Sequence, residues 1–131
     1  MDFSPFVGLP WRERGRDASG CDCWGLVTLV YAAAGVTLPS FADGYTSIED
    51  RAAIDALVTA GLDLWSPVET GRELALDCVL MQIAGGWHVG VMQRRGHVLH
   101  MPRGKTSVIE PLSRYARVIE GIYAYAPEGM L

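Results

Sequence analysis

The second half of the chain, where short β segments follow one another closely, is the feature that most limits the fold. Pairs of breakers such as Gly85-Gly86 and Arg95-Gly96 divide it into runs rich in β-branched and aromatic residues. The predicted strands are residues 78–83, 88–93, 98–101, 107–110 and 118–125. Closely spaced strands that come after helices are typical of an α+β fold with an antiparallel sheet.

The first half of the chain contains helical patterns. Between residues 23 and 34, apolar side chains recur at helical spacing, with Asp22 placed to cap the N-terminus and Gly35 at the C′ position. Because this helix is so apolar, it is expected to be largely buried.

The remaining segments complete the expected architecture. A second helix is predicted from Thr46 or Ser47 to about Gly61, followed by a connector over residues 62–75, whereas residues 1–20 read as a loop with at most one helical turn. The prediction is one domain over residues 1–131, with N-terminal helices packed on an antiparallel sheet of about five strands.

Cys23 is the first candidate for chemistry, because it stands where a glycine-rich loop enters the predicted helix. The unpaired N–H groups and positive dipole end of a helix start favour thiolate over thiol, and the thiolate is the nucleophile. On this reasoning, Cys23 in an ion pair with a histidine should remain a thiolate well below the usual cysteine pKa.

Two histidines on neighbouring predicted strands could meet beside this cysteine. His88 and His100 are directly opposed if the hairpin turn is centred on Arg94, whereas a two-residue turn would place them on opposite faces. His88 then suits the general base and His100 the group that orients it. His97 has the wrong parity and points to the other face.

Other readings of these residues are less favoured. A lone cysteine at a helix start is usually a small buried residue, and a lone strand histidine is usually structural; their combination is what favours catalysis. Cys21-x-Cys23 lacks the spacing of a zinc motif, so no metal or other cofactor is predicted. Cys21 and Cys78 are interpreted as structural, and the three cysteines are expected to be reduced.

Charge and hydropathy exclude several partner classes. The net charge is −4, which does not suit a nucleic-acid-binding surface. No apolar run is long enough for a membrane helix, and the N-terminus lacks the features of a cleaved signal peptide. We therefore expect synthesis in the cytoplasm, no membrane insertion, and any export by a route without a cleaved signal.

At these residues the chain resembles the NlpC family of bacterial cell-wall cysteine peptidases, which have a papain-like fold. The matching stretches, in order, are GLPW (8–11), DCWGLV (22–27), LD (76–77), HVGV (88–91) and VLH (98–100). The resemblance implies a triad of Cys23 as nucleophile, His88 as base and His100 as third polar residue. It also implies an oxyanion hole at the Cys23 N–H, and a role for Asp22 in binding a free amine of the substrate.

The chain departs from the family pattern at three places. Trp24 replaces the serine that follows the cysteine, Trp11 replaces a tyrosine near the entrance, and Leu76-Asp77 replaces Gly-Asp. Both tryptophans are expected near the substrate groove. An aromatic residue after the cysteine is similar to the versions found in phage tails and gene transfer agents.

The resemblance implies a phage tail-tip peptidase whose partners are the peptidoglycan stem peptide and other tail-tip proteins. It would act in the cell wall after incorporation in the virion, and the bond expected to be cut joins D-γ-glutamate to a diamino acid. Two alternatives are a tail structural or assembly module with little hydrolysis and a papain-like acyltransferase or amidase with another substrate.

Overall fold

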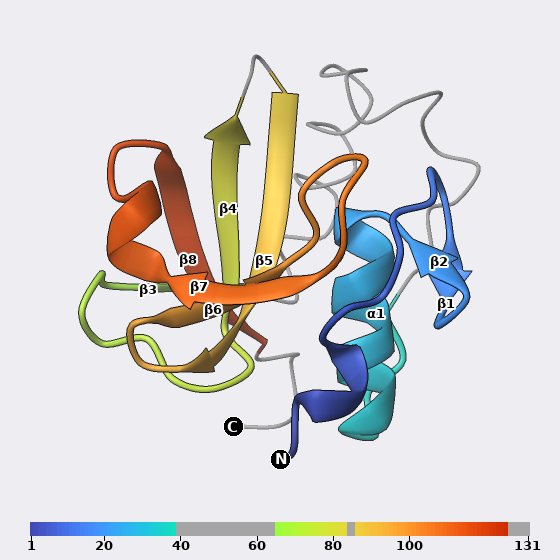
Figure 1. Cartoon of the computed structure of the whole chain (residues 1–131). Coiled ribbons are helices and arrows are strands. Elements are labelled where there is room, and N and C mark those ends of the chain that lie inside the picture. The colour runs from blue at the N-terminus through green and yellow to red at the C-terminus, as the bar shows by residue number, and fades with distance from the viewer. Residues whose placement is uncertain (39–64, 84–85, 126–131) are drawn as a thin grey trace.

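A computed structural model describes residues 1–38, 65–83 and 86–125. Its main element is a six-stranded sheet in the order β3-β8-β4-β5-β6-β7, in which all neighbouring strands are antiparallel (Figure 1). The strands are β3 (Trp65–Val68), β4 (Cys78–Ile83), β5 (Gly86–Arg94), β6 (His97–His100), β7 (Val108–Pro111) and β8 (Ile119–Tyr125).

The N-terminal part of the chain lies on one side of this sheet, where α1 runs alongside β5 (Figure 1). It consists of η1 (Ser4–Phe6), a small hairpin of β1 (Arg16–Asp17) and β2 (Gly20–Cys21), and α1 (Cys23–Ala33). A second short 3-10 helix, η3 (Leu112–Tyr115), lies between β7 and β8 in the chain. Within the described residues, no helix is long and apolar enough to cross a membrane.

The sheet separates two apolar clusters, because alternate residues of a strand point to opposite faces. The first cluster, here called the α1-side core, joins α1 residues such as Leu26 and Val30 to Val89 and Val91 of β5. The second, here called the η3-side core, contains Met81, Met92 and Leu112 among others. The α+β class and the antiparallel sheet are therefore confirmed.

The strand and helix predictions can be compared directly with these bounds. The five predicted strands and the first helix are present, each within about two residues of its expected ends. The prediction of a connector over residues 62–75 was wrong at β3, and the sheet has six strands instead of about five. The predicted second helix, residues 46–61, lies outside the described residues.

Packing explains why β3 forms where the sequence signal is weak. Trp65 makes edge contacts with Tyr31 of α1 and Tyr125 of β8, at ring-centroid distances of 5.7 and 5.3 Å. Pro67 is tolerated because β3 is an edge strand, where a missing N–H donor costs no ladder bond. These contacts are to residues distant in sequence, so the strand is a consequence of the tertiary structure.

Candidate active site

Cys23 begins α1, directly after a loop that is tied to the helix by Asp22. The Asp22 carboxylate caps the helix by accepting the Gly25 N–H at 2.8 Å, and it also accepts from the Arg16 guanidinium at 2.8 Å. Its second oxygen accepts the Arg14 N–H. The predicted N-cap is thus confirmed, and it fixes the cysteine in the first turn of the helix.

The two histidines are brought together by a register that differs from the predicted one. His100 pairs with Gly90, not with His88, so direct opposition was wrong. The turn between Arg94 and His97 has two residues, which alone would separate the histidines onto opposite faces. A register shift between Met92 and Arg94 restores the parity, so both rings lie on one face.

Gly90 explains how the histidines meet although they are diagonal neighbours. With no side chain opposite His100, the His88 ring can lean across the strand pair, and diagonal positions are within reach of aromatic side chains. His88 Nε2 and His100 Nδ1 are 2.9 Å apart, and the rings are nearly perpendicular. Both residues are buried, His100 almost completely.

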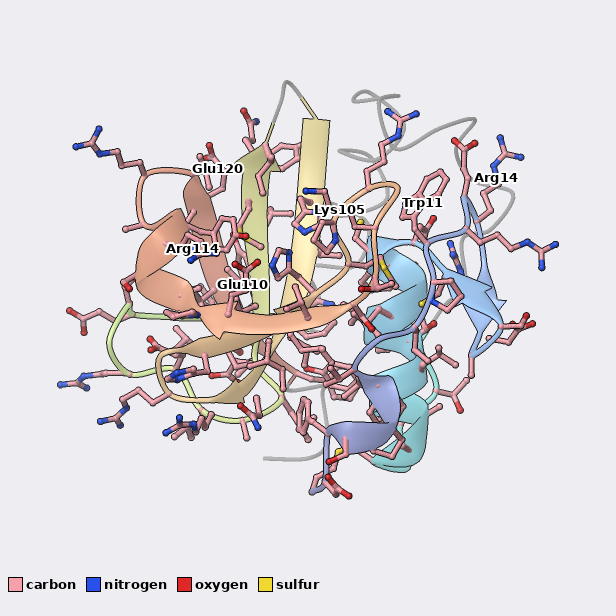
Figure 2. The ribbon with its side chains drawn as sticks, viewed as in Figure 1. Trp11, Arg14, Lys105, Glu110, Arg114 and Glu120 are labelled. Carbon is pink, nitrogen blue, oxygen red and sulfur yellow. The ribbon has the colours of Figure 1, made fainter. Side chains whose placement is uncertain are left out.

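Glu110 extends this contact, and the sequence analysis did not identify it. His100 Nε2 and Glu110 Oε1 are 2.7 Å apart, and the same oxygen accepts the Tyr115 hydroxyl at 2.6 Å. Arg114 pairs with the other carboxylate oxygen, and Figure 2 shows Glu110 and Arg114 side by side. Strand parity could have found Glu110, because residues two apart on β7 share a face.

Cys23 approaches this histidine pair from the opposite face of the sheet. His88 lies on the face of the η3-side core, whereas Cys23 belongs to the α1-side core. Pairing of β6 with β5 begins only at Gly90, and the N–H of the preceding Val89 donates to the Cys23 sulfur. The thiol therefore contacts the backbone directly next to His88. Within the described part of the chain, no hydrogen bond joins it to the His88 ring.

Burial sets the protonation states of this resting arrangement. Burial, followed by the nearby Asp22 carboxylate, raises the pKa of Cys23 to about 12, which outweighs the N–H donors of Val89 and Trp24. Burial and the His100 ring lower the pKa of His88 to about 3. The resting pair is a neutral thiol and a neutral imidazole, so the expectation of a stable thiolate was wrong for this state: desolvation exceeds the helix-start effect.

The three residues expected to bind substrate lie close to Cys23: Asp22 and Trp24 flank it, and Trp11 pairs with Cys21 of β2. Asp22 is 1% exposed and already bound by Arg16, so binding a substrate amine remains a prediction that requires Arg16 to be displaced. Trp11 lies beside β2, on the α1 side of the molecule in Figure 2, with the Arg103 guanidinium over its ring at 5.9 Å. Trp24 is half-buried in the first turn of α1.

A single methyl group at Gly90 is expected to disturb the histidine pair. The Cβ of Gly90→Ala would lie 2.6 Å from Val98 Cγ2 and 3.0 Å from the Leu99 carbonyl oxygen. We expect a loss of stability of about 1–3 kcal/mol, together with altered histidine resonances in NMR spectra.

Gly96→Ala is the control, because it lies in the same hairpin with open space around it but a φ of +81°. It should cost about 1–2 kcal/mol through backbone strain and leave the resonances of His88 and His100 unchanged. Equal spectral changes in both variants would contradict the role given to Gly90.

Acid is expected to destabilise the fold through His88. Its folded pKa of about 3 lies below the ordinary value of 6.5, so the unfolded state binds the proton first. Stability is therefore full well above pH 6.5 and falls as the pH drops toward 3, by about 2 kcal/mol between pH 6.5 and 4.5. Urea unfolding measured across this range tests it. A His88→Gln variant should show a shallower pH dependence, and an identical slope would contradict the assignment.

A helix-start cysteine, a histidine pair on an antiparallel sheet and the α+β architecture together define the class of papain-like cysteine peptidases. The NlpC/P60 family model matches residues 8–119. The chain belongs to the NlpC/P60 family, which comprises cysteine peptidases and includes peptidoglycan hydrolases. No curated protein matches the chain.

Solved structures show the same fold at low sequence identity. An NlpC/P60 family protein from Bacillus cereus is 24% identical, with a TM-score of 0.65 over 93% of this chain. The NlpC/p60 domain of the peptidoglycan hydrolase SagA is 20% identical, with a TM-score of 0.63, and the match covers 91% of this chain and 89% of that domain. This chain spans only 37% of the Bacillus cereus protein.

Proposed function

We propose that this chain hydrolyses an amide bond in the stem peptide of peptidoglycan, with Cys23 as nucleophile. The proposal rests on the placement of the Cys23 thiol against the backbone next to His88. The Nε2 atom of His88 is held by His100, which leaves Nδ1 for the thiol proton. Membership of the NlpC/P60 family supports the substrate class, since the SagA domain of similar fold comes from a peptidoglycan hydrolase.

The chemistry follows from the arrangement of these groups. The Cys23 proton passes to His88 Nδ1, the nitrogen not engaged by His100, and the sulfur attacks the amide carbonyl carbon. Backbone N–H groups at the start of α1, beginning with that of Cys23, stabilise the oxyanion. His88 then gives the proton to the departing amine, leaving a thioester. Water, deprotonated by His88, hydrolyses the thioester and restores the thiol.

The neutral resting pair implies that substrate binding prepares the nucleophile. The thiol and imidazole are both buried, and proton transfer between them in the free enzyme is unfavourable given their shifted pKa values. A substrate carbonyl seated beside the N–H donors at the helix start would stabilise negative charge as it develops. Closer approach of His88 to the sulfur in the complex is part of the proposal, as catalytic hydrogen bonds often tighten only with substrate.

More specifically, we propose that the bond cut joins D-γ-glutamate to a diamino acid. We also propose that the chain is part of a phage tail tip. These assignments rest on the aromatic Trp24 after the nucleophile and on the order of the motifs. In this setting, the chain acts within the cell wall during entry and contacts neighbouring tail-tip proteins.

Mass spectrometry of purified muropeptides, incubated with the reduced chain, tests the proposal. The expected products are one fragment ending in D-γ-glutamate and another beginning with the diamino acid. Alkylation of Cys23, verified by peptide mapping because Cys21 and Cys78 are also present, should abolish product formation. Cleavage of a different amide would correct the bond, and the absence of any cleavage would contradict the proposal.

Burial of the nucleophile favours one alternative, a tail structural module with little hydrolysis. Cys23 is only 7% exposed, and its pKa is raised to about 12, as expected for a core residue. If this alternative holds, virions carrying Cys23→Ala should assemble and enter thick-walled hosts normally. Failure of entry by fully assembled virions would favour the peptidase instead.

A further inference from the structure

A continuous line of buried polar contacts runs from His88 across three strands to Glu110. His88 Nε2 meets His100 Nδ1, and His100 Nε2 meets Glu110 Oε1. The register places Glu110 on the same face as His100, because His100 pairs with Val108, two residues before Glu110. Each histidine therefore has one ring nitrogen committed to the next group along this line.

Glu110 is held as a carboxylate at the end of the line. The Tyr115 hydroxyl donates to Oε1, and Arg114 pairs with Oε2, so the titratable groups that contact Glu110 come from β6 and η3. These hydrogen bonds, with Tyr115 contributing most, lower the pKa of Glu110. An ionised carboxylate has no proton to donate, so His100 must present an N–H to it from Nε2.

We propose that Glu110 is a positioning residue that sets the tautomers of both histidines and thereby makes Nδ1 of His88 the proton acceptor for Cys23. With Nε2 protonated, neutral His100 has its lone pair on Nδ1 and accepts from His88 Nε2. Neutral His88 then carries its own lone pair on Nδ1. Without Glu110, the other tautomer of His100 would donate to His88 and reverse this order.

The environment makes this selection effective. His100 is 1% exposed, so an Nε2–H without an acceptor would be unsatisfied and costly. Burial lowers the pKa of His100, while Glu110 opposes this effect, and the neutral ring is the form for which the tautomer matters. Glu110 touches neither Cys23 nor, on this proposal, the substrate, so its effect passes through His100.

Nitrogen NMR of the histidine rings in the wild-type chain is the first test. Long-range proton–nitrogen correlations distinguish an Nε2–H ring from an Nδ1–H ring. At neutral pH, we expect both His88 and His100 to be Nε2–H tautomers. An Nδ1–H tautomer of His100 in the wild-type chain would overturn the proposal. This readout does not require turnover, so it is independent of whether the peptidase function proposed above holds.

Two substitutions of Glu110 form the second test, with Glu120→Gln as the matched control because Glu120 is exposed on β8. Glu110→Ala should give a mixed His100 tautomer and reduce kcat by at least about tenfold, with little change in KM. Glu110→Gln keeps an acceptor oxygen, so it should retain the Nε2–H tautomer and recover most of kcat. A pure Nε2–H ring in Glu110→Ala, with kcat equal to that of Glu120→Gln, would overturn the proposal.

This inference rests on the proposed function only for its kinetic arm. If Glu110→Ala does not fold, the spectrum of Glu110→Gln decides: loss of the carboxylate should lower the pKa of His100 further, because Glu110 raises it. An unchanged or raised His100 pKa in Glu110→Gln would show that Glu110 does not contact His100, and would overturn the proposal. Absence of hydrolysis by a wild-type chain with the expected tautomers would count against the peptidase and not against the tautomer assignment.

Discussion

Replacing Cys23 with alanine is expected to reduce hydrolysis of muropeptides by at least about a thousandfold while leaving the fold intact. The thiol is the only group at the start of α1 that can form the proposed thioester. Because alanine fits the space of the 7%-exposed side chain, the cost in stability should be only about 1 kcal/mol. Initial rates with saturating muropeptide, together with urea unfolding, separate the two effects.

Cys21→Ala and Cys78→Ala are the matched controls for this substitution. All three cysteines are buried, and burial raises the pKa of Cys21 to about 11 and that of Cys78 to about 12. They therefore share the chemistry and the environment of Cys23 but not its position at the helix start. Both controls should retain hydrolysis within about tenfold of wild type. Equal losses in all three variants would argue that folding, and not nucleophilic attack, underlies the effect.

Gly25→Ala is expected to cause a large loss of stability, although the substitution adds only one methyl group. An alanine inside a helix ordinarily stabilises it by about 1 kcal/mol relative to glycine. At this position, however, the Cβ would lie 2.0 Å from the Gly15 carbonyl oxygen and 3.0 Å from Cys21 Cβ. The loop that precedes Cys23, which contains Gly15 and Cys21, would have to move away from α1, at a cost of about 3 kcal/mol or more.

The matched control is Gly35→Ala, just beyond the C-terminus of the same helix. Its surroundings are open, but its φ of +86° disfavours a side chain, so the expected cost is about 1–2 kcal/mol. Urea unfolding of both variants gives the comparison. A Gly25→Ala variant as stable as Gly35→Ala would show that the loop does not pack on the helix as described.

Local patterns were sufficient for much of the fold. Asp22 before an apolar helical run predicted the start of α1, and a left-handed Gly35 follows its end. Glycine and proline breakers located the strands from β4 to β8, because such residues interrupt regular structure wherever they occur. The placement of Cys23 at a helix start and the two histidines on neighbouring strands, His88 and His100, indicated the candidate site from the sequence.

Contacts between distant residues decided the rest. β3 forms because Trp65 packs against Tyr31 and Tyr125, and a register shift near Met92 determines which residue faces His100. Glu110 joins the histidines only through the pairing of β6 with β7. The protonation state of Cys23 was the clearest case. Helix position favours thiolate, but desolvation depends on everything packed around the sulfur, and only the tertiary structure shows that burial prevails.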